Sequence, residues 1–244
     1  RFFSLFDDYR ERWRMKGIRS SMSEYNVKHE VVPNFGDLKM MLSCIRPDVE
    51  IRYTTDGSEP HEYSMLYRRP LIIKQSQTVK CATFKDGKRL GQILAIPVHV
   101  SGVTGRNVLR STSVERRLVN GVRGSLKNTD DEWTFWKKND SIAVTIDVGA
   151  RKRLGKVSLG YLNHFGLGIH KPQRVEVWLS DNDVHYWKAT EQTFGRDEIF
   201  AEGRFTEEME LILKDVAIYV RVIMKGAGKC PEHHVRPGLE TQIY

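Results

Sequence analysis

The first pattern along the chain is that of an amphipathic helix over residues 3–16. Its apolar positions recur at helical spacing and form one aromatic-rich stripe: Phe2, Leu5, Phe6, Tyr9 and Trp13. Ser4 is placed to cap the start of the helix. Gly17 is a typical stop, because glycine readily adopts the left-handed conformation that ends helices. So large an apolar face predicts a packing partner, either in this chain or in a domain outside it.

From residue 27 to residue 100, apolar and polar positions alternate over short stretches, as they do in half-buried strands. Turn residues such as Asp56-Gly57 and residues 85–88 separate these stretches. Short strands at this spacing, divided by Gly and Pro turns, indicate a β-sandwich. The predicted strands are Lys28–Val32, Leu38–Ser43, Glu50–Thr54, Leu71–Ile73, Gln77–Phe84 and Ala95–Val100.

Residues 102–244 also show strand patterns, which predict a second β-sandwich. Arg151-Lys152-Arg153 follows a strand that ends at Gly149, so we expect a solvated turn there. The connection 160–174 is long for a hairpin, and such loops on β scaffolds tend to carry binding residues. The fold class is therefore all-β, with two β-sandwich domains preceded by one N-terminal helix. The predicted strands of this part are 142–149, 156–162, 175–180, 209–213 and 217–224.

Composition narrows the class of protein. The chain has 244 residues, of which 40% are hydrophobic and 29% charged, as is typical of globular proteins. No apolar run approaches the ~20 residues that cross a bilayer. The net charge of +8 comes without a run of five like charges, so it does not by itself indicate nucleic-acid binding. Cys44, Cys81 and Cys230 match neither a metal signature nor a disulfide framework, which favours buried free thiols over a Cys44–Cys81 bridge.

Residues 53–60, Tyr-Thr-Thr-Asp-Gly-Ser-Glu-Pro, combine a strand end, a tight turn and a proline that stops further pairing. This run resembles the signature of the fibronectin type III-like domain near the C-terminus of bacterial β-hexosaminidases and chitobiases. Residues 78–84 resemble the closing strand of that domain. Residues 1–26 resemble the last helix and exit of the catalytic barrel in family 20 glycoside hydrolases. The resemblance implies a remnant of a catalytic domain over 1–26 and a sandwich over 27–101.

Residues 118–125, Leu-Val-Asn-Gly-Val-Arg-Gly-Ser, precede Trp133 and then Ile146-Asp147-Val148-Gly149. Together these pieces resemble the opening of a discoidin-like module of the coagulation factor 5/8 type C kind. The resemblance implies a jelly-roll sandwich over 102–244, similar to family 32 carbohydrate-binding modules. Those modules bind terminal sugars with loops at one rim, often beside a structural calcium ion.

Two departures from the family pattern bear on calcium. Asn120 stands where the family usually has Asp, and the chain stops at Tyr244, where the last strand would normally run on to acidic residues. Both departures remove carboxylate oxygens, whereas calcium takes about 6–8 oxygen ligands. We therefore expect no required cofactor, and Asn120 and Ser125 mark only the loop where calcium would bind.

The candidate sugar-binding residues are polar or aromatic side chains of the second domain. Amide, imidazole and guanidinium groups bond sugar hydroxyls, and an aromatic ring can stack on a pyranose. The alternative is an ordinary surface loop with satisfied histidines, and for a tryptophan a place in the sandwich core. The candidates are Trp136, then Asn163, His164, Phe165 and His170 in the long loop, and His233, His234 and Arg236, which the family resemblance places at the same rim.

Two further kinds of residue group are candidates for a metal site or an active site. Cys230, His233 and His234 suggest zinc but supply at most three ligands with no second pair nearby, so we interpret them as part of a surface loop. Family 20 enzymes use an adjacent Asp-Glu pair, and Asp131-Glu132 and Asp197-Glu198 are such pairs. Neither pair follows a buried strand, and a carboxylate becomes a useful acid when burial raises its pKa. We assign no catalytic residues.

The resemblance thus implies a non-catalytic accessory region of an exported β-N-acetylhexosaminidase. Its expected partners are the terminal sugars of glycans and the upstream catalytic barrel of the same polypeptide, with no nucleic acid and no membrane span. The alternative is a purely structural scaffold that docks on the barrel without binding sugar. The feature that discriminates the two is whether Asn163, His164, His170 and Arg236 converge on one rim.

Overall fold

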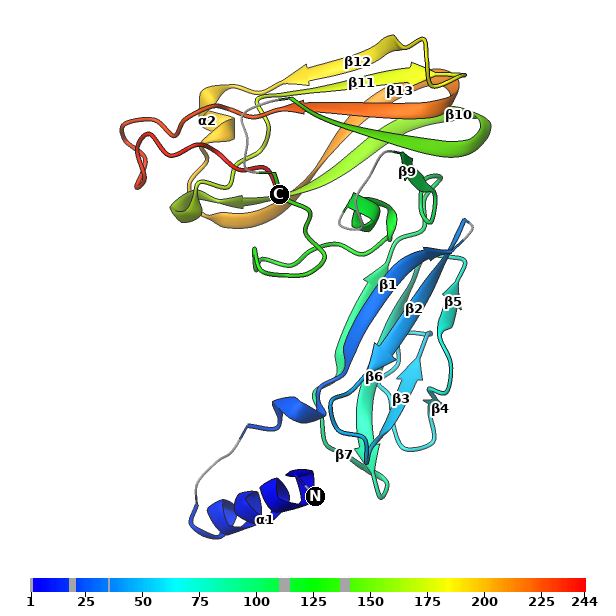
Figure 1. Cartoon of the computed structure of the whole chain (residues 1–244), viewed down its shortest axis with the longest axis vertical. Coiled ribbons are helices and arrows are strands. Elements are labelled where there is room, and N and C mark those ends of the chain that lie inside the picture. The colour runs from blue at the N-terminus through cyan, green and yellow to red at the C-terminus, as the bar shows by residue number, and fades with distance from the viewer. Residues whose placement is uncertain (1, 18–20, 35, 110–114, 137–140) are drawn as a thin grey trace. The chain divides into compact units, whose positions relative to one another are not determined.

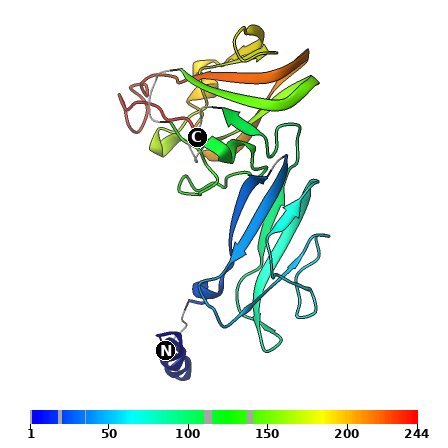
Figure 2. The same cartoon turned by 45° about the vertical axis from the view of Figure 1, so that its right-hand side comes forward.

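The computed structural model describes the chain except for residues 1, 18–20, 35, 110–114 and 137–140. It divides into two compact units, the first comprising Arg1–Val31 and Lys39–His99, the second Val32–Leu38 and Val100–Tyr244. Both units are built from strands, and one helix precedes them (Figures 1 and 2). The predicted all-β class with two β-sandwich units after an N-terminal helix is confirmed. Among the described residues, the helices are too short or too polar to cross a membrane.

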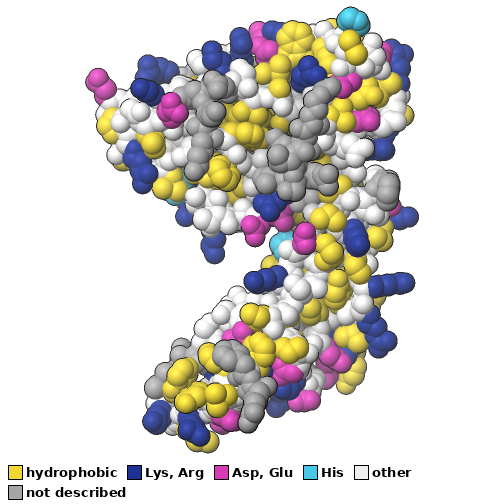
Figure 3. Space-filling model, viewed as in Figure 1, with side chains coloured by type: hydrophobic (Ala, Val, Ile, Leu, Met, Phe, Trp, Pro, Cys, Tyr) yellow, Lys and Arg dark blue, Asp and Glu magenta, His cyan; other side chains and the backbone are white. Residues whose placement is uncertain are grey.

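Helix α1 spans Phe2–Met15, and Gly17 follows it with a φ of +70°. The predicted cap at Ser4 is wrong, because Ser4 lies inside the helix. Hydrophobic side chains gather on the surface of α1 (Figure 3). The predicted stripe is therefore largely open to solvent: its members Leu5, Phe6, Tyr9 and Trp13 are exposed, as is Met15 at the end of the helix.

The first unit contains two sheets. The smaller sheet has the order β1-β2-β5, and the larger has the order β4-β3-β6-β7 with β8 paired to β6. Their inward side chains, such as Met40, Ile73, Val79 and Ile96, are at most 2% exposed. The end of β1 and the start of β2 fall within Val32–Leu38 and so belong to the second unit. The strands are β1 Lys28–Asn34, β2 Asp37–Ser43, β3 Glu50–Thr54, β4 Met65–Leu66, β5 Leu71–Ile73, β6 Gln77–Lys85, β7 Lys88–Arg89 and β8 Leu94–Val98, with η1 at Ser23–Tyr25.

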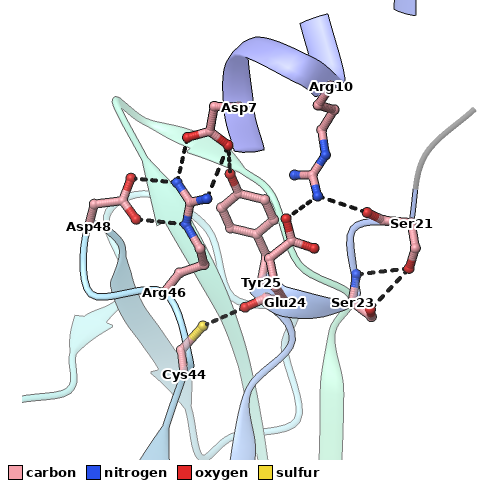
Figure 4. A network of polar contacts seen from close by, with 9 residues as sticks. All are labelled: Asp7, Arg10, Ser21, Ser23, Glu24, Tyr25, Cys44, Arg46 and Asp48. Carbon is pink, nitrogen blue, oxygen red and sulfur yellow. Dashed lines mark hydrogen bonds and ion pairs between the residues drawn. The ribbon is translucent and has the colours of Figure 1, made fainter. Parts of the chain in front are cut away.

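A buried guanidinium ties α1 to the first unit (Figure 4). The side chain of Arg46 is 1% exposed and donates to both carboxylate oxygens of Asp7 on α1, at 3.0 and 2.7 Å. It also donates to both oxygens of Asp48, at 2.9 Å each. The rings of Phe3 and Tyr25 lie 4.7 and 4.8 Å from its guanidinium carbon. These hydrogen bonds lower the pKa of Asp7 and of Asp48 below the ordinary value.

The second unit is a five-stranded sheet in the order β12-β11-β13-β10-β9. Two of its strands are very long and antiparallel. The strands are β9 Asn107–Leu109, β10 Ile142–His164, β11 Arg174–Ser180, β12 Trp187–Thr193 and β13 Arg204–Lys225, joined by η2 Glu115–Val119, η3 Phe165–Leu167 and α2 Arg196–Ile199.

The long strands curve over one another and supply both layers around the core (Figure 1). The first part of β10 pairs with the last part of β13 and, through it, with β11; the last part of β10 pairs with the first part of β13. Buried Val144 and Leu211, from the two parts, pack in the same cluster. The predicted turn at 151–153 is wrong: these residues lie within β10, after a register shift beyond Asp147 where Gly149 has a φ of +85°. The glycine thus bends a continuous strand and does not end it.

Candidate functional site

The candidate site is built at the end of β10, where the chain makes a short closed loop. Asn163 and His164 end the strand, and η3 follows at once. The backbone of His164 pairs with Ile169 in both directions, at 2.9 and 3.3 Å. Gly168 closes this loop with a φ of +71°. The chain therefore returns on itself and brings His170 beside Asn163.

The segment after β13 runs along this loop. The backbone of His170 donates to Gln242 at 3.0 Å, and Gln242 donates to Gly168 at 2.9 Å. A Cβ atom on Gly168 would lie 2.9 Å from Leu239 Cδ2 and 3.5 Å from Cys230 Sγ, so a side chain would not fit without movement. We call residues 163–170 together with 230–242 the loop end. It joins stretches about 60 residues apart in sequence.

Three of the predicted site residues form a buried hydrogen-bonded chain in the loop end. Asn163, His170 and His234 are 2%, 1% and 3% exposed. Asn163 Nδ2 donates to the carbonyls of Ala201 and Gly203, at 3.0 and 3.3 Å, which directs its Oδ1 toward His170 Nδ1 at 3.3 Å. His170 Nε2 lies 3.3 Å from His234 Nε2, and the backbone N–H of Arg236 donates to His234 Nδ1 at 2.9 Å.

The partners determine where each proton lies. Because the amide group of Asn163 uses its N–H donors on two carbonyls, its oxygen accepts, and His170 carries its proton on Nδ1. Because His234 Nδ1 accepts from Arg236, His234 carries its proton on Nε2 and donates it to His170 Nε2. Burial, with a smaller contribution from His234, lowers the pKa of His170 to about 4. The chain of bonds is complete with both imidazoles neutral.

Aromatic rings surround these histidines. The ring of Phe165 lies 4.1 Å from the ring of His234 and 6.0 Å from that of His170. Phe200, at the end of α2, meets His170 edge to face at 5.0 Å. Packed rings of this kind hold the imidazoles in place, so the buried part of the loop end is a rigid support.

The outward side chains of the loop end differ in kind from the buried ones. His164 and Phe165 are half-buried, whereas His233 and Arg236 are exposed. Arg204, exposed on β13, is the register partner of His164. Burial and the charges of Arg204 and Arg236 lower the pKa of His164. We call these five residues the rim.

The rim contains a buried polar atom that lacks a hydrogen-bond partner among the described residues. His164 Nδ1 is buried and meets no hydrogen-bond partner among the residues that the structure describes. Arg204 Nε donates to the carbonyl of Leu126 at 2.6 Å, which anchors that guanidinium at the rim. The rim thus offers one open imidazole nitrogen, one anchored guanidinium and one aromatic ring. Sequence analysis missed Arg204, because no sequence pattern gives the register between β10 and β13.

Trp136 is partly buried against the core of the second unit. Its backbone pairs with Ile243 in both directions, at 3.0 and 3.2 Å, and its side chain packs against the core of the second unit. The neighbouring Phe135 is exposed and stacks on Tyr244 with ring centroids 5.1 Å apart. These contacts are the ones expected if Trp136 anchors the core of the sandwich, which is the alternative to sugar binding for this residue.

The loop where calcium would bind is organised by its own side chains. Asn120 is 1% exposed, donates from Nδ2 to Glu132 at 2.5 Å and accepts at Oδ1 from the Val122 backbone at 2.9 Å. The backbone of Ser125 donates to Asp130 at 2.8 Å. Both predicted residues thus bond within the loop, and the expectation that no calcium is required there stays a prediction.

The grouping of Cys230 with histidines differs from the sequence-based one. His233 is exposed, and His170 takes its place: donor atoms of His170, Cys230 and His234 all lie within 4.8 Å of one another, and all three residues are buried. The spacing along the chain favoured His233, whereas the loop return that brings in His170 leaves no mark in local spacing. Cys44, Cys81 and Cys230 have free thiols.

The comparisons with known proteins agree with the sequence resemblance in the first unit. Residues 40–96 match the family model described as "Fn3 associated". This match covers the strands β2 to β8 of the first unit in large part and confirms the fibronectin type III-like resemblance there. A search of curated proteins finds no match to the chain.

Three of the solved structures that match the chain have TM-scores of 0.35 or less. The C-terminal domain of a chitobiase from Bacteroides fragilis is 15% identical, with 59% of this chain and 91% of that chain covered and a TM-score of 0.35. The module CpGH89CBM32-4 of Clostridium perfringens, in complex with GlcNAc-α-1,4-galactose, is 11% identical, with 59% and 89% covered and a TM-score of 0.35. A protein titled glycoside hydrolase is 9% identical, with 88% and 70% covered and a TM-score of 0.28.

Proposed function

We propose that this chain is a non-catalytic accessory region of an exported β-N-acetylhexosaminidase, and that the rim of its second unit binds terminal sugars of glycans. The observation that carries the binding half is the rim itself. It gathers an aromatic ring, imidazoles and guanidinium groups from three segments that are distant in sequence. The Fn3-associated match over residues 40–96 supports the accessory half.

The chemistry of the rim suits a sugar ring. A pyranose presents hydroxyl groups at its edge and apolar C–H groups on its face. Arg204 and Arg236 provide donors for hydroxyl oxygens, and His164 Nδ1 is a buried nitrogen that still lacks a partner among the described residues. Phe165 is half-buried and backed by His234, so its ring is held still while part of it faces solvent. Little side-chain entropy is lost when such a ring is covered.

The buried chain below the rim gives it a fixed shape. Asn163, His170 and His234 do not face a ligand, since each is at most 3% exposed. Their hydrogen bonds hold the 163–170 loop against the segment after β13. A binding surface that is ordered before the ligand arrives avoids the cost of ordering it on binding.

Acid catalysis by this chain is not part of the proposal. The acidic pairs Asp131-Glu132 and Asp197-Glu198 lie in a turn and in α2, where Asp131, Asp197 and Glu198 are exposed. A carboxylate serves as a general acid when burial favours its neutral form, and these three side chains lack that burial. Incubation of the chain with a chromogenic N-acetylglucosaminide is expected to release no chromophore above the buffer rate, and turnover would refute this part.

Calorimetric titration with N-acetylglucosamine, N-acetylgalactosamine and galactose tests the binding half. We expect heat with at least one sugar, and affinity lower by about 10- to 150-fold in Arg236→Ala, because a hydrogen bond to a charged group contributes about 1.5–3 kcal/mol. Phe165→Ala is expected to weaken binding as well. Arg68→Ala and Tyr63→Ala remove an exposed arginine and an exposed tyrosine of the first unit and serve as matched controls.

The second candidate function is a scaffold that binds no sugar. The observation that favours it is the complete set of hydrogen bonds among Asn163, His170 and His234, which leaves those side chains no role toward a ligand. The exposed apolar stripe of α1 is a surface that an upstream catalytic barrel would cover. Absence of heat with every sugar tested, with calcium supplied, would favour the scaffold.

A further inference from the structure

His170, Cys230 and His234 form a compact set of metal-ligand atoms within the loop end. Their donor atoms lie within 4.8 Å of one another, and the three side chains are buried. They come from two segments that are joined here by backbone hydrogen bonds. We propose that these three side chains bind one zinc ion through His170 Nε2, Cys230 Sγ and His234 Nε2. This goes beyond sugar binding at the rim and does not depend on it.

The separation of the two imidazole nitrogens fits a shared ion. Zinc binds histidine nitrogens at about 2.0–2.1 Å in tetrahedral geometry, which places two such nitrogens about 3.3–3.4 Å apart. The observed distance from His170 Nε2 to His234 Nε2 is 3.3 Å. A cysteine sulfur at about 2.3 Å from the ion would lie about 3.6 Å from each nitrogen. Since one nitrogen of each histidine lies within 4.8 Å of the sulfur, an inward movement of about 1.2 Å or less brings the sulfur to that distance.

His170 is already arranged as a metal ligand. Metal-binding histidines almost always donate their second ring N–H to an oxygen acceptor, which holds the ring and fixes its tautomer. His170 Nδ1 faces Asn163 Oδ1 at 3.3 Å, and Asn163 is itself oriented by the carbonyls of Ala201 and Gly203. His170 Nε2 is then the nitrogen left to bind an ion, and it lies 3.3 Å from His234 Nε2. Asn163 is the positioning residue of this site.

Cys230 supplies a buried free thiol. As a free thiol it carries a proton. A zinc ion displaces that proton and binds the thiolate, so one proton is released for each ion bound. A thiolate with two imidazoles suits zinc, and these three ligands include no carboxylate of the kind that calcium or magnesium prefers.

His234 must change its tautomer when the ion binds. Its Nδ1 now accepts the backbone N–H of Arg236 at 2.9 Å, and its proton lies on Nε2. Binding through Nε2 moves this proton to Nδ1, with no net change in charge, and ends the contact with the Arg236 N–H. The turn that carries Arg236 is exposed and is the part free to adjust. The His234–Arg236 contact is therefore the local signature of the ion, present without metal and absent with it.

Three protein ligands leave one position of a tetrahedral ion to water or another small ligand. The ion would join the 163–170 loop to the segment after β13, directly below the rim. Zinc that binds only the folded chain raises the thermal midpoint of the second unit. The site therefore links metal supply to the order of the rim loops.

Cobalt titration of tag-free, metal-stripped chain tests the proposal, because a cobalt–thiolate bond gives a near-ultraviolet charge-transfer band. We expect one cobalt ion per chain with this band, displacement by zinc, and loss of the band in Cys230→Ser and His170→Gln. Asn163→Ala is expected to weaken zinc binding by about 10- to 100-fold. His233→Gln, the exposed neighbour, and Cys44→Ser are matched controls that retain it.

The same cobalt titration can also refute the proposed zinc site. Absence of the band in the parent chain, or a band that persists in Cys230→Ser, refutes it. So does loss of binding in His233→Gln with binding kept in His170→Gln. Should His170→Gln fail to fold by circular dichroism, Cys230→Ser decides, because it replaces a sulfur by an oxygen at nearly unchanged volume. Sugar calorimetry on the same samples separates the two proposals, because either result can occur without the other.

Discussion

Replacing Arg46 by Met removes the charge that fastens α1 to the first unit (Figure 4). The guanidinium makes four hydrogen bonds to Asp7 and Asp48, and its side chain is 1% exposed. Met fills a similar length of space without any donor. The two carboxylates would then lose their common partner. The polar contacts left to α1 would include the Arg10–Glu24 ion pair and the hydrogen bond from the Tyr25 hydroxyl to Asp7 at 3.2 Å.

The magnitude follows from how far each partner is buried. Breaking a fully buried ion pair costs about 3–5 kcal/mol, because one charge stays in the interior without a partner. Here the charges left behind are Asp7 and Asp48, whose side chains are 38% and 36% exposed, so water solvates them in part. We therefore reduce the expected cost of Arg46→Met to about 2–3 kcal/mol. That is about a 30- to 150-fold shift in the docking equilibrium.

Amide hydrogen exchange over residues 2–15 measures this equilibrium locally. A helix of this length is marginal in water when it is not packed, so exchange of its amides follows undocking. We expect exchange across α1 to accelerate by about 30- to 150-fold in Arg46→Met, with β6 little changed. Arg68→Met, at an exposed arginine of the same unit, is the matched control. Unchanged exchange in α1 of the Arg46 variant would show that the network does not hold the helix.

Two further predictions concern other parts of the chain. Acid should loosen α1, because the pKa of Asp7 and of Asp48 is lowered in the folded state. The stability that these two carboxylates add is fully present above their unfolded pKa of about 3.9, and it is lost as the pH falls through their folded pKa. Exchange over 2–15, compared between pH 7 and pH 3, measures it, and equal protection would contradict the linkage. Gly168→Ala should destabilise the second unit by about 1–3 kcal/mol, because φ there is +71° and a Cβ atom would lie 2.9 Å from Leu239 Cδ2. Thermal unfolding measures this loss, with Gly228→Ala as the control, because φ there is +83° but no atom lies within 4 Å of the added Cβ. An equal loss of stability in both variants would mean that backbone strain alone, and not the contact with Leu239, accounts for the effect.

Strands bounded by clear turns were predictable from sequence. The bounds of β3 Glu50–Thr54 and β5 Leu71–Ile73 agree with prediction to the residue, because alternation ends at a turn or proline on either side. The strands β4 and β7, of two residues each, carry too short a pattern to be seen. At Gly149 the positive φ of a bulge and that of a turn favour the same residue, so sequence alone does not distinguish a bent strand from an ended one.

The sequence predicted which residues belong to the candidate site better than which of them are buried and which face outward. Asn163, His170 and His234 were singled out as polar residues of two loops, and the structure brings them into one hydrogen-bonded chain. Their burial was not readable, because it depends on Phe165 and Phe200 packing over them from elsewhere. The role of Arg204 depends on strand register, and the pairing of Cys230 with His170 depends on how the loop returns. Long-range geometry of this kind has no local sequence pattern.

The most direct test of the account is a two-dimensional amide NMR titration of the chain with N-acetylhexosamines and galactosides. Binding at the rim predicts shifts that saturate and that concentrate in residues 163–167, 204 and 233–236, while amides of β3 and β6 stay in place. Spectra that remain unchanged at every sugar concentration, or shifts that centre on the first unit, would contradict a glycan-binding rim.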